Sequence, residues 1–139
     1  MPAIMSLPYP FPVPTPITTK LHGYDFYESI GRPVKVVAPM VDQSELPYRL
    51  LCRKYGADLC YTPMFHSRLF ATDPKYREEA FGVNSSQDRP LIVQFCSNDP
   101  DMLLSAARFV EGRCDAVDIN LGCPQVIRSL PCIPGRVAG

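Results

Sequence analysis

Residues 118–125 read D-I-N-L-G-C-P-Q, and this stretch decides the fold that we expect for the chain. An apolar run from Ala116 predicts a strand that ends at Asn120 and leads directly into Gly122-Cys123-Pro124. Glycine frees the backbone to turn, and proline biases the residue before it toward an extended or turn conformation. A thiol is therefore expected at the C-terminal tip of a strand, shortly after an amide. In parallel α/β proteins, ligands bind at this end of the strands.

Three earlier segments are predicted to be strands of the same kind, at residues 34–39, 59–62 and 91–95. They are short, continuous apolar runs, as is typical of parallel strands that are buried on both faces. Residues 63–88, between the second and third strands, are expected to form a loop with one short helix around 74–79.

Two longer helices are predicted between the strands. One is capped by Ser44 and runs to about Tyr55, and the other is capped by Asp99, begins at Pro100 and runs to about Val110. Their apolar residues recur at helical spacing and are expected to face the core: Leu46, Leu50, Leu51 and Tyr55 in the first helix, and Leu103, Leu104, Ala107 and Val110 in the second.

The order of elements, β-α-β-(α)-β-α-β, predicts an α/β fold with parallel crossover units. Four strands fit either an open doubly wound sheet or half of an eight-stranded barrel. The segment V-V-A-P-M-V-D-Q (36–43) lacks glycine, which argues against a dinucleotide-binding Rossmann unit. Polar and turn-forming residues gather at the C-terminal ends of the strands, and this favours the barrel.

Composition narrows the function classes. The 14 Lys and Arg residues balance 14 Asp and Glu residues, so the broad basic surface of an independent nucleic-acid-binding domain is not expected. The six cysteines show no metal-binding spacing, so we expect no metal. The sequence shows no signal peptide and no apolar run of about 18 residues, so we expect no membrane span and a cytoplasmic or nuclear location.

The chain is expected to have three parts. Residues 1–23 contain six prolines between Pro2 and Pro16 and are predicted to be a disordered extension. Residues 24–125 hold the strand and helix patterns of a partial barrel. Residues 126–139 carry no clear pattern of either kind.

The four strand tips, in this order, resemble the tRNA-dihydrouridine synthase family. The matching segments are V-A-P-M-V-D-Q-S-E (37–45), Y-T-P-M (61–64), R-P-L-I-V-Q-F (89–95) and C-D-A-V-D-I-N-L-G-C-P-Q (114–125). The combination of V-D-Q-S-E-L with L-G-C-P-Q resembles the eukaryotic tRNA-dihydrouridine(16/17) synthase branch. The resemblance implies the N-terminal half of an FMN-dependent TIM (β/α)₈ barrel, with about four parallel strands.

The resemblance also implies an activity and roles for five residues. Members of the family use NADPH, or NADH, to reduce FMN, and a hydride then passes to C6 of a uracil that is flipped out of the tRNA D-loop. Cys123 would give the proton to C5. Asn120 would hold the edge of the uracil or flavin, Pro39 and Met40 would pack their backbone against the isoalloxazine ring, and Gln94 would hydrogen-bond to it. An ordinary thiol, with a pKa of about 8.5, is mostly protonated at neutral pH and suits a proton donor.

Other polar residues are given less specific roles. Asp118 is expected to face a neighbouring helix or loop, or to act in the site. His66 fits either the site or a solvent-facing loop. Arg49, Arg53 and Lys54 are expected on a solvated helix face, and Arg68 and Arg77 on the surface or against RNA phosphate. The remaining cysteines are expected to be structural: Cys52, Cys60, Cys96, Cys114 and Cys132.

Three hypotheses remain for this chain. Beyond Cys-Pro-Gln the family continues into a second half-barrel and a helical tRNA-binding domain, so we expect a truncated product that is inactive alone and binds no stoichiometric FMN. A non-catalytic fragment or interaction module is the second hypothesis, since a half-barrel leaves strand edges unpaired. Another FMN barrel oxidoreductase, similar to dihydroorotate dehydrogenase, is the third, and the L-G-C-P-Q segment argues against it.

Overall fold

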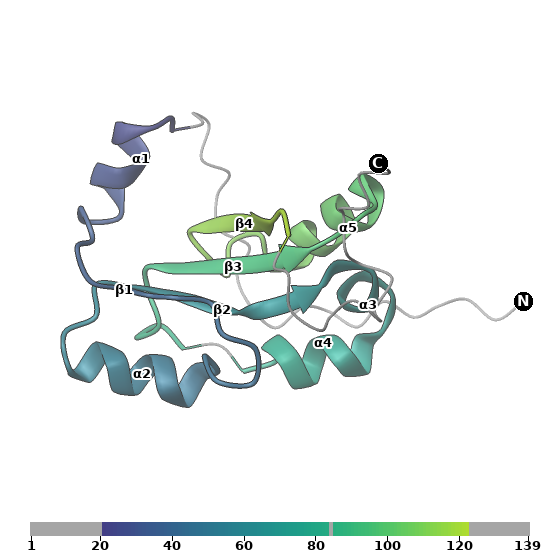
Figure 1. The fold of residues 1–139 in the computed structure, drawn as a ribbon, viewed down its shortest axis with the longest axis horizontal. Helices are drawn as coiled ribbons and strands as arrows, with labels where there is room; N and C mark the ends of the chain where they lie inside the picture. Colours follow the sequence, from purple (N-terminus) through teal and green to yellow (C-terminus); the bar gives the residue numbers. More distant parts are fainter. Residues whose placement is uncertain (1–20, 84, 123–139) are drawn as a thin grey trace, which may run out of the picture.

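The computed structural model describes residues 21–83 and 85–122, in which five helices and four strands alternate (Figure 1). The elements are α1 (Tyr24–Ser29), β1 (Val36–Val37), α2 (Leu46–Lys54), β2 (Leu59–His66), α3 (Ser67–Thr72), α4 (Pro74–Phe81), β3 (Leu91–Cys96), α5 (Pro100–Val110) and β4 (Ala116–Asn120). The strands form one sheet in the order β1-β2-β3-β4, and each neighbouring pair is parallel.

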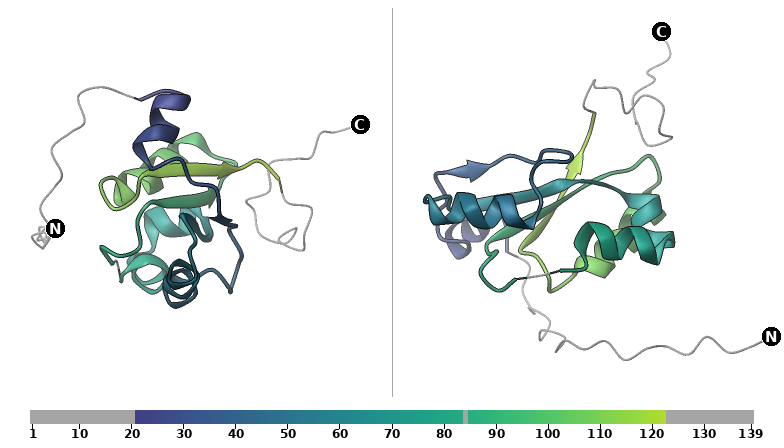
Figure 2. Two further views of the ribbon diagram at one scale, coloured as in Figure 1. Left: turned by 90° about the vertical axis from the view of Figure 1, so that its left-hand side faces the viewer. Right: turned by 90° about the horizontal axis from the view of Figure 1, so that it is seen from below.

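The hydrophobic core lies between one face of this sheet and the helices. Phe65 of β2 and Phe95 of β3 point to this face and pack against Phe70 of α3, Phe81 of α4 and Ala106 of α5. The views in Figure 2 show the helices that connect the strands gathered on this side of the sheet. A doubly wound sheet reverses its strand order and carries helices on both faces. Strands in chain order with their helices on one face are therefore the β/α units of a barrel, which confirms the predicted fold class.

The first strand is shorter than predicted. It spans only Val36 and Val37. At its N-terminal end, the backbone N–H groups of Val34 and Lys35 donate to the Asp58 carboxylate, at 3.0 and 2.8 Å, and not to a neighbouring strand. These hydrogen bonds also hold the pKa of Asp58 below its usual value. The prediction of a strand over residues 34–39 was therefore too long at both ends.

The segment after the second predicted strand is more ordered than a loop. β2 continues through Pro63 to His66, and its pairing with β3 shifts register between Tyr61 and Met64. Proline has no N–H for a sheet hydrogen bond, so an irregular step at this point leaves no donor missing. Helix α3 follows at once and buries Phe70 completely. The prediction of a loop with one short helix over 63–88 was wrong for this part, although α4 is close to the predicted short helix.

Helix α2 presents a different face to the protein from the predicted one. It begins at Leu46 with Glu45 at the N-cap position, whereas the buried Ser44 hydroxyl bonds to the backbone of Met40. Leu51 is 51% exposed and Tyr55 is 78% exposed, and the buried residue of this helix is Arg49. The assignment of Ser44 as the cap and the inward position of Leu51 and Tyr55 were therefore wrong.

Helix α5 follows the prediction closely. The Asp99 side chain accepts hydrogen bonds from the N–H groups of Asp101 and Met102, and Pro100 is the first helical residue. Val110 is fully buried, but Leu104, which was expected to face inward, is 53% exposed. Helix α1 has no buried residue. Of the predicted disordered extension, only residues 21–23 lie within the described residues, and the predicted tail, 126–139, lies outside them.

Candidate active site

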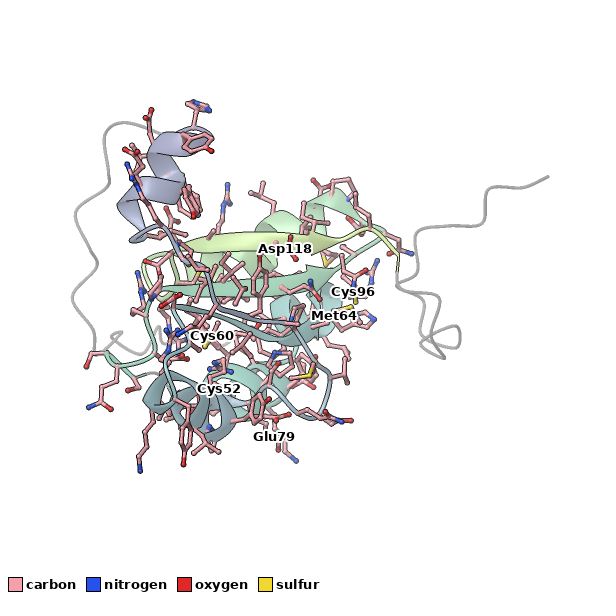
Figure 3. All side chains as sticks on the ribbon, turned by 60° about the vertical axis from the view of Figure 1, so that its left-hand side comes forward. Cys52, Cys60, Met64, Glu79, Cys96 and Asp118 are labelled. Atoms are coloured by element: carbon pink, nitrogen blue, oxygen red, sulfur yellow. The ribbon has the colours of Figure 1, made fainter. Side chains whose placement is uncertain are left out.

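The face of the sheet opposite the core, here called the inner face, carries the polar residues of the candidate site. Successive strand residues point to opposite faces. Because Phe95 faces the helices, its neighbour Gln94 lies on the inner face, and its register partner on β4 is Asp118. Figure 3 labels Asp118 on the edge strand β4, Cys96 on the neighbouring strand β3, and Met64 on β2, the next strand of the sheet.

Three hydrogen bonds connect the polar residues of the inner face. The Gln94 Nε2 atom donates to Oδ2 of Asp118 at 2.6 Å, and Nδ2 of Asn120 donates to Oε1 of Gln94 at 3.4 Å. Oδ1 of Asn120 accepts the backbone N–H of Gly122 at 2.9 Å. The structure thus brings together two predicted site residues, Gln94 and Asn120, and joins them to the backbone of Gly122.

Asp118 is the residue of this group whose position the sequence left undecided. Its side chain lies against Gln94 on the inner face, and not against a helix or loop. A usable signal was present, since Asp118 and Asn120 are two residues apart in one strand and must share a face. The negative charge of Asp118 also reaches Tyr61 of β2, whose pKa is raised mainly by burial and further by this carboxylate.

The backbone of Gln94 is fixed as firmly as its side chain. Its N–H donates to Oγ1 of Thr62 at 3.2 Å, at the place where the register of β2 against β3 shifts. Thr62 is fully buried and Gln94 is 8% exposed. A buried polar side chain that is held at both its backbone and its amide has little freedom to move, so Gln94 is a preorganised donor and acceptor.

Pro39 and Met40 lie after β1 in a tight turn that Ser44 holds. The backbone N–H of Met40 donates to Oγ of Ser44 at 2.9 Å, and the Met40 carbonyl accepts from the Ser44 hydroxyl and the Ser44 N–H. Both polar backbone atoms of Met40 are therefore already bonded within the chain. Pro39 and Met40 are half-buried, and this peptide can offer a ligand a fixed surface for packing.

His66 ends β2 and caps the helix that follows. It is 8% exposed, and its Nδ1 atom accepts the N–H of Leu69 at 3.4 Å, while its own backbone N–H donates to the Tyr76 hydroxyl. Burial is the main cause that lowers the pKa of His66, so the ring favours its neutral form. Of the two predicted settings, the solvent-facing loop is excluded.

The cysteines divide between described and undescribed residues. Cys123, the predicted proton donor, and Cys132 lie outside the described residues. Cys60 and Cys96 are buried, Cys52 and Cys114 are half-buried, and all four are free thiols. Burial raises the pKa of Cys60 and raises that of Cys114 to about 11. Within residues 21–83 and 85–122, no cluster of His, Cys, Asp and Glu is suited to a metal ion.

Two of the three α2 residues that were expected on a solvated face are instead held inside the protein. Arg49 is 4% exposed and lies 2.7 Å from the fully buried Asp88 carboxylate, which also accepts from Arg53 at 3.1 Å. Arg53 further donates to the carbonyl of Pro90 at 2.6 Å. Of the three, only Lys54 is exposed. The prediction failed because it placed the cations by helical spacing and could not place Asp88, which lies far away in the sequence.

The two arginines that were considered for RNA phosphate have partners within the protein. Arg68 pairs with Asp99 at 3.0 Å. The Arg77 guanidinium lies 3.8 Å from the centre of the Phe109 ring and donates to the carbonyl of Phe70. Both side chains are thus used to hold helices together. In the part of the chain that the structure describes, no helix is long and apolar enough to span a membrane.

Comparison with known proteins gives a consistent result. Residues 36–129 match the family model described as dihydrouridine synthase (Dus). The chain is 61% identical over 109 residues to the tRNA-dihydrouridine(16/17) synthase [NAD(P)(+)] of Schizosaccharomyces pombe, and 62% identical over 110 residues to the enzyme of the same name from Saccharomyces cerevisiae. Each alignment covers 78% of this chain.

A more distant relative is named for a different position in tRNA. The human protein named tRNA-dihydrouridine(20a/20b) synthase [NAD(P)+]-like is 50% identical over 95 residues, which is 68% of this chain. The chain spans 27% of the S. pombe relative, 26% of the S. cerevisiae relative and 30% of the human one. It therefore corresponds to about a quarter to a third of the length of the relatives that it matches.

Proposed function

The chain belongs to the dihydrouridine synthase family, and on this premise we propose that its strands form part of a flavin-binding active site that reduces uridine in tRNA to 5,6-dihydrouridine. The observation that carries the proposal is a hydrogen-bonded pair of carboxamides, Gln94 and Asn120, on the inner face. Asn120 also accepts the N–H of Gly122, the residue before Cys123. The relatives are named for dihydrouridine formation in tRNA and for NAD(P), which supports tRNA as substrate and NADPH or NADH as reductant.

The residues at the strand ends fit FMN. The edge of an isoalloxazine ring alternates hydrogen-bond acceptors with a donor, and a primary carboxamide offers both. Gln94 uses one of its two Nε2 hydrogens for Asp118, so a second hydrogen remains for a ring atom. At Pro39 and Met40, the two polar backbone atoms of Met40 are bonded to Ser44, and the segment offers a surface against which a flat ring can pack. When bound, FMN would supply the hydride.

The chain's own residues would bind, orient and protonate. Gln94 would hold the flavin edge, and Pro39 and Met40 would support the ring. Asn120 would hold the edge of the uracil or flavin while its Oδ1 atom accepts the Gly122 N–H. Cys123 would give its proton to C5 of the uracil, because an ordinary thiol is mostly protonated at neutral pH. The uracil must leave the base stack to reach these groups.

The proposal can be tested in a chimera of the S. cerevisiae relative. Residues 36–125 of this chain would replace the corresponding segment of that enzyme, in cells that lack the native enzyme. We expect the chimera to bind FMN and to restore dihydrouridine in tRNA, measured by mass spectrometry of tRNA nucleosides. A folded, FMN-loaded chimera that makes no dihydrouridine would contradict the proposal.

The Cys123→Ala form of the same chimera tests the proton donor. Loss of a positioned acid typically lowers a rate by about 10² to 10⁴, so most turnover should disappear while the FMN content stays unchanged. Turnover equal to that of the unmodified chimera would contradict the role of Cys123. That the 139-residue chain is inactive alone stays a prediction, which the same tRNA assay would check.

A further inference from the structure

We propose that Asp118 is a positioning residue that sets the orientation of the Gln94 and Asn120 carboxamides and, through them, holds the Gly122 backbone that leads into Cys123. This inference rests on the proposed function, because the orientation of these groups affects catalysis only if the inner face binds the flavin and the uracil. Asp118 would touch neither of them and would act through Gln94.

The proposal starts from the direction of the three hydrogen bonds. Gly122 donates to Asn120 at 2.9 Å, Asn120 donates to Gln94 at 3.4 Å, and Gln94 donates to Asp118 at 2.6 Å. The donors thus point from Gly122 to Asn120, from Asn120 of β4 across to Gln94 of β3, and from Gln94 back to the Asp118 carboxylate of β4. The shortest contact is the one that ends on the charged acceptor, as expected for a charge-assisted hydrogen bond.

The groups at the two ends of this series of hydrogen bonds, Gly122 and Asp118, determine how the two carboxamides between them are oriented. A backbone N–H can only donate, so Asn120 must present Oδ1 to Gly122, which leaves its Nδ2 for Gln94. A carboxylate can only accept, so Gln94 must present Nε2 to Asp118, which leaves its Oε1 for Asn120. With both carboxamides oriented in this way, the Nδ2 donor of Asn120 faces the Oε1 acceptor of Gln94. If either carboxamide turned over, two acceptors or two donors would face each other.

Burial makes the wrong orientation costly. Gln94 is 8% exposed and its strand is buried along its whole length, so water has little access to a misdirected amide. An unsatisfied buried polar group is penalised much more strongly than one at the surface. Without the charge of Asp118, Gln94 would lose its preferred orientation, and the Gly122 hydrogen bond would weaken two steps away.

The first experiment measures the Gly122 hydrogen bond directly in the full 139-residue chain. We expect Asp118→Ala to raise the hydrogen-exchange rate of the Gly122 amide by about fivefold, the change that corresponds to one typical hydrogen bond, as measured by NMR. Asp101→Ala, which removes an exposed carboxylate from the first turn of α5, is the matched control and should leave the Gly122 rate unchanged.

Moving the carboxylate from position 118 to position 94 should restore the orientation of Asn120. In Asp118→Asn combined with Gln94→Glu, the new carboxylate at position 94 accepts from the amides at 118 and 120, so Asn120 again presents Oδ1 to Gly122. We expect its exchange rate to return to within about twofold of wild type. The inference is overturned if Asp118→Ala exchanges like wild type, or if the double variant exchanges about fivefold faster than wild type. If Asp118→Ala fails to fold, the double variant tests the inference in its place.

The second experiment uses the chimera described above. We expect Asp118→Ala to lower kcat on the order of tenfold to a hundredfold, as a misplaced catalytic group does, with the KM for tRNA and the FMN content unchanged. An unmodified chimera without activity would count against the proposed function alone. An active chimera in which Asp118→Ala keeps the full kcat would overturn the positioning role and leave the proposed function standing.

Discussion

At the scale of single residues, Asp88 shows how strongly one buried charge can tie elements together. Its side chain is 1% exposed and forms salt bridges with Arg49 and Arg53 of α2, whose side chains are 4% and 12% exposed. Arg49 also donates to the carbonyl of Ser44 at 2.6 Å. Asp88 therefore connects the segment before β3 to α2 and to the turn that holds Met40. Removing one partner of a buried ion pair leaves an uncompensated charge in the interior.

We expect Asp88→Ala to lower the free energy of unfolding by about 3 to 5 kcal/mol, because Arg49 would stay buried without its counter-charge. Urea denaturation of the 139-residue chain, followed by circular dichroism, measures this loss. The control is Glu79→Gln, because Glu79 is 69% exposed and lies 3.8 Å from Lys75. An exposed pair of this kind contributes less than about 1 kcal/mol. Equal losses in the two variants would contradict the special role of Asp88.

Cys114 allows a second test at the same scale. Burial raises its pKa to about 11, compared with about 8.5 for an ordinary thiol, so at pH 8 its thiolate fraction is about two-hundredfold below that of a free thiol. The thiolate is the reactive form, so alkylation by iodoacetamide should be slow at pH 8 and should accelerate as the pH rises toward 11. Mass spectrometry of Cys114 peptides, with glutathione as the reference thiol, measures the rates. A Cys114 that reacts at pH 8 as fast as glutathione would show that burial does not control its ionisation.

At the scale of elements, sequence patterns predicted those helices and strands whose ends are determined by contacts between residues close together in the chain. Helix α5 was predicted well because Asp99 and Pro100 start it through contacts within its own first turn. Helix α3 has no comparable pattern, since it depends on burying Phe70 against β2, β3 and α4. The N-terminal end of β1 has the same kind of cause, because Asp58 takes the N–H groups that a longer strand would use.

In the candidate site, too, local sequence patterns indicate some features and not others. Gln94 stands out as a polar residue in an apolar strand, and Asn120 as an amide shortly before a glycine, whereas their expected roles came from the resemblance to the family. The hydrogen bond from Gln94 to Asp118 joins residues 24 positions apart, so no local pattern shows it. The salt bridge from Arg49 to Asp88 was missed for this reason too. Sequence patterns therefore indicate which residues are unusual, whereas their partners depend on the pairing of strands.

At the scale of the whole molecule, the described sheet is open and its last strand is poorly covered. β4 pairs with β3 on one side only. On the face of β4 away from Asp118, Val117 is 38% exposed and Ile119 is 47% exposed. Val117 lines a shallow hollow with Leu104 and Ala107 of α5. An open strand edge beside apolar side chains is a template for pairing with another strand.

We expect the 139-residue chain to self-associate through β4, and Ile119→Lys to weaken this association, because a lysine at an edge strand opposes the pairing of one copy with another. Sedimentation velocity over a series of protein concentrations measures the effect. The matched control is Val34→Lys, since Val34 is 82% exposed but lies outside the strands and should leave the association unchanged. The β4 edge is excluded as the contact if both lysine variants associate as strongly as the wild-type chain. If the wild-type chain stays monomeric at all concentrations, the exposed edge is protected in some other way, and the expectation is wrong.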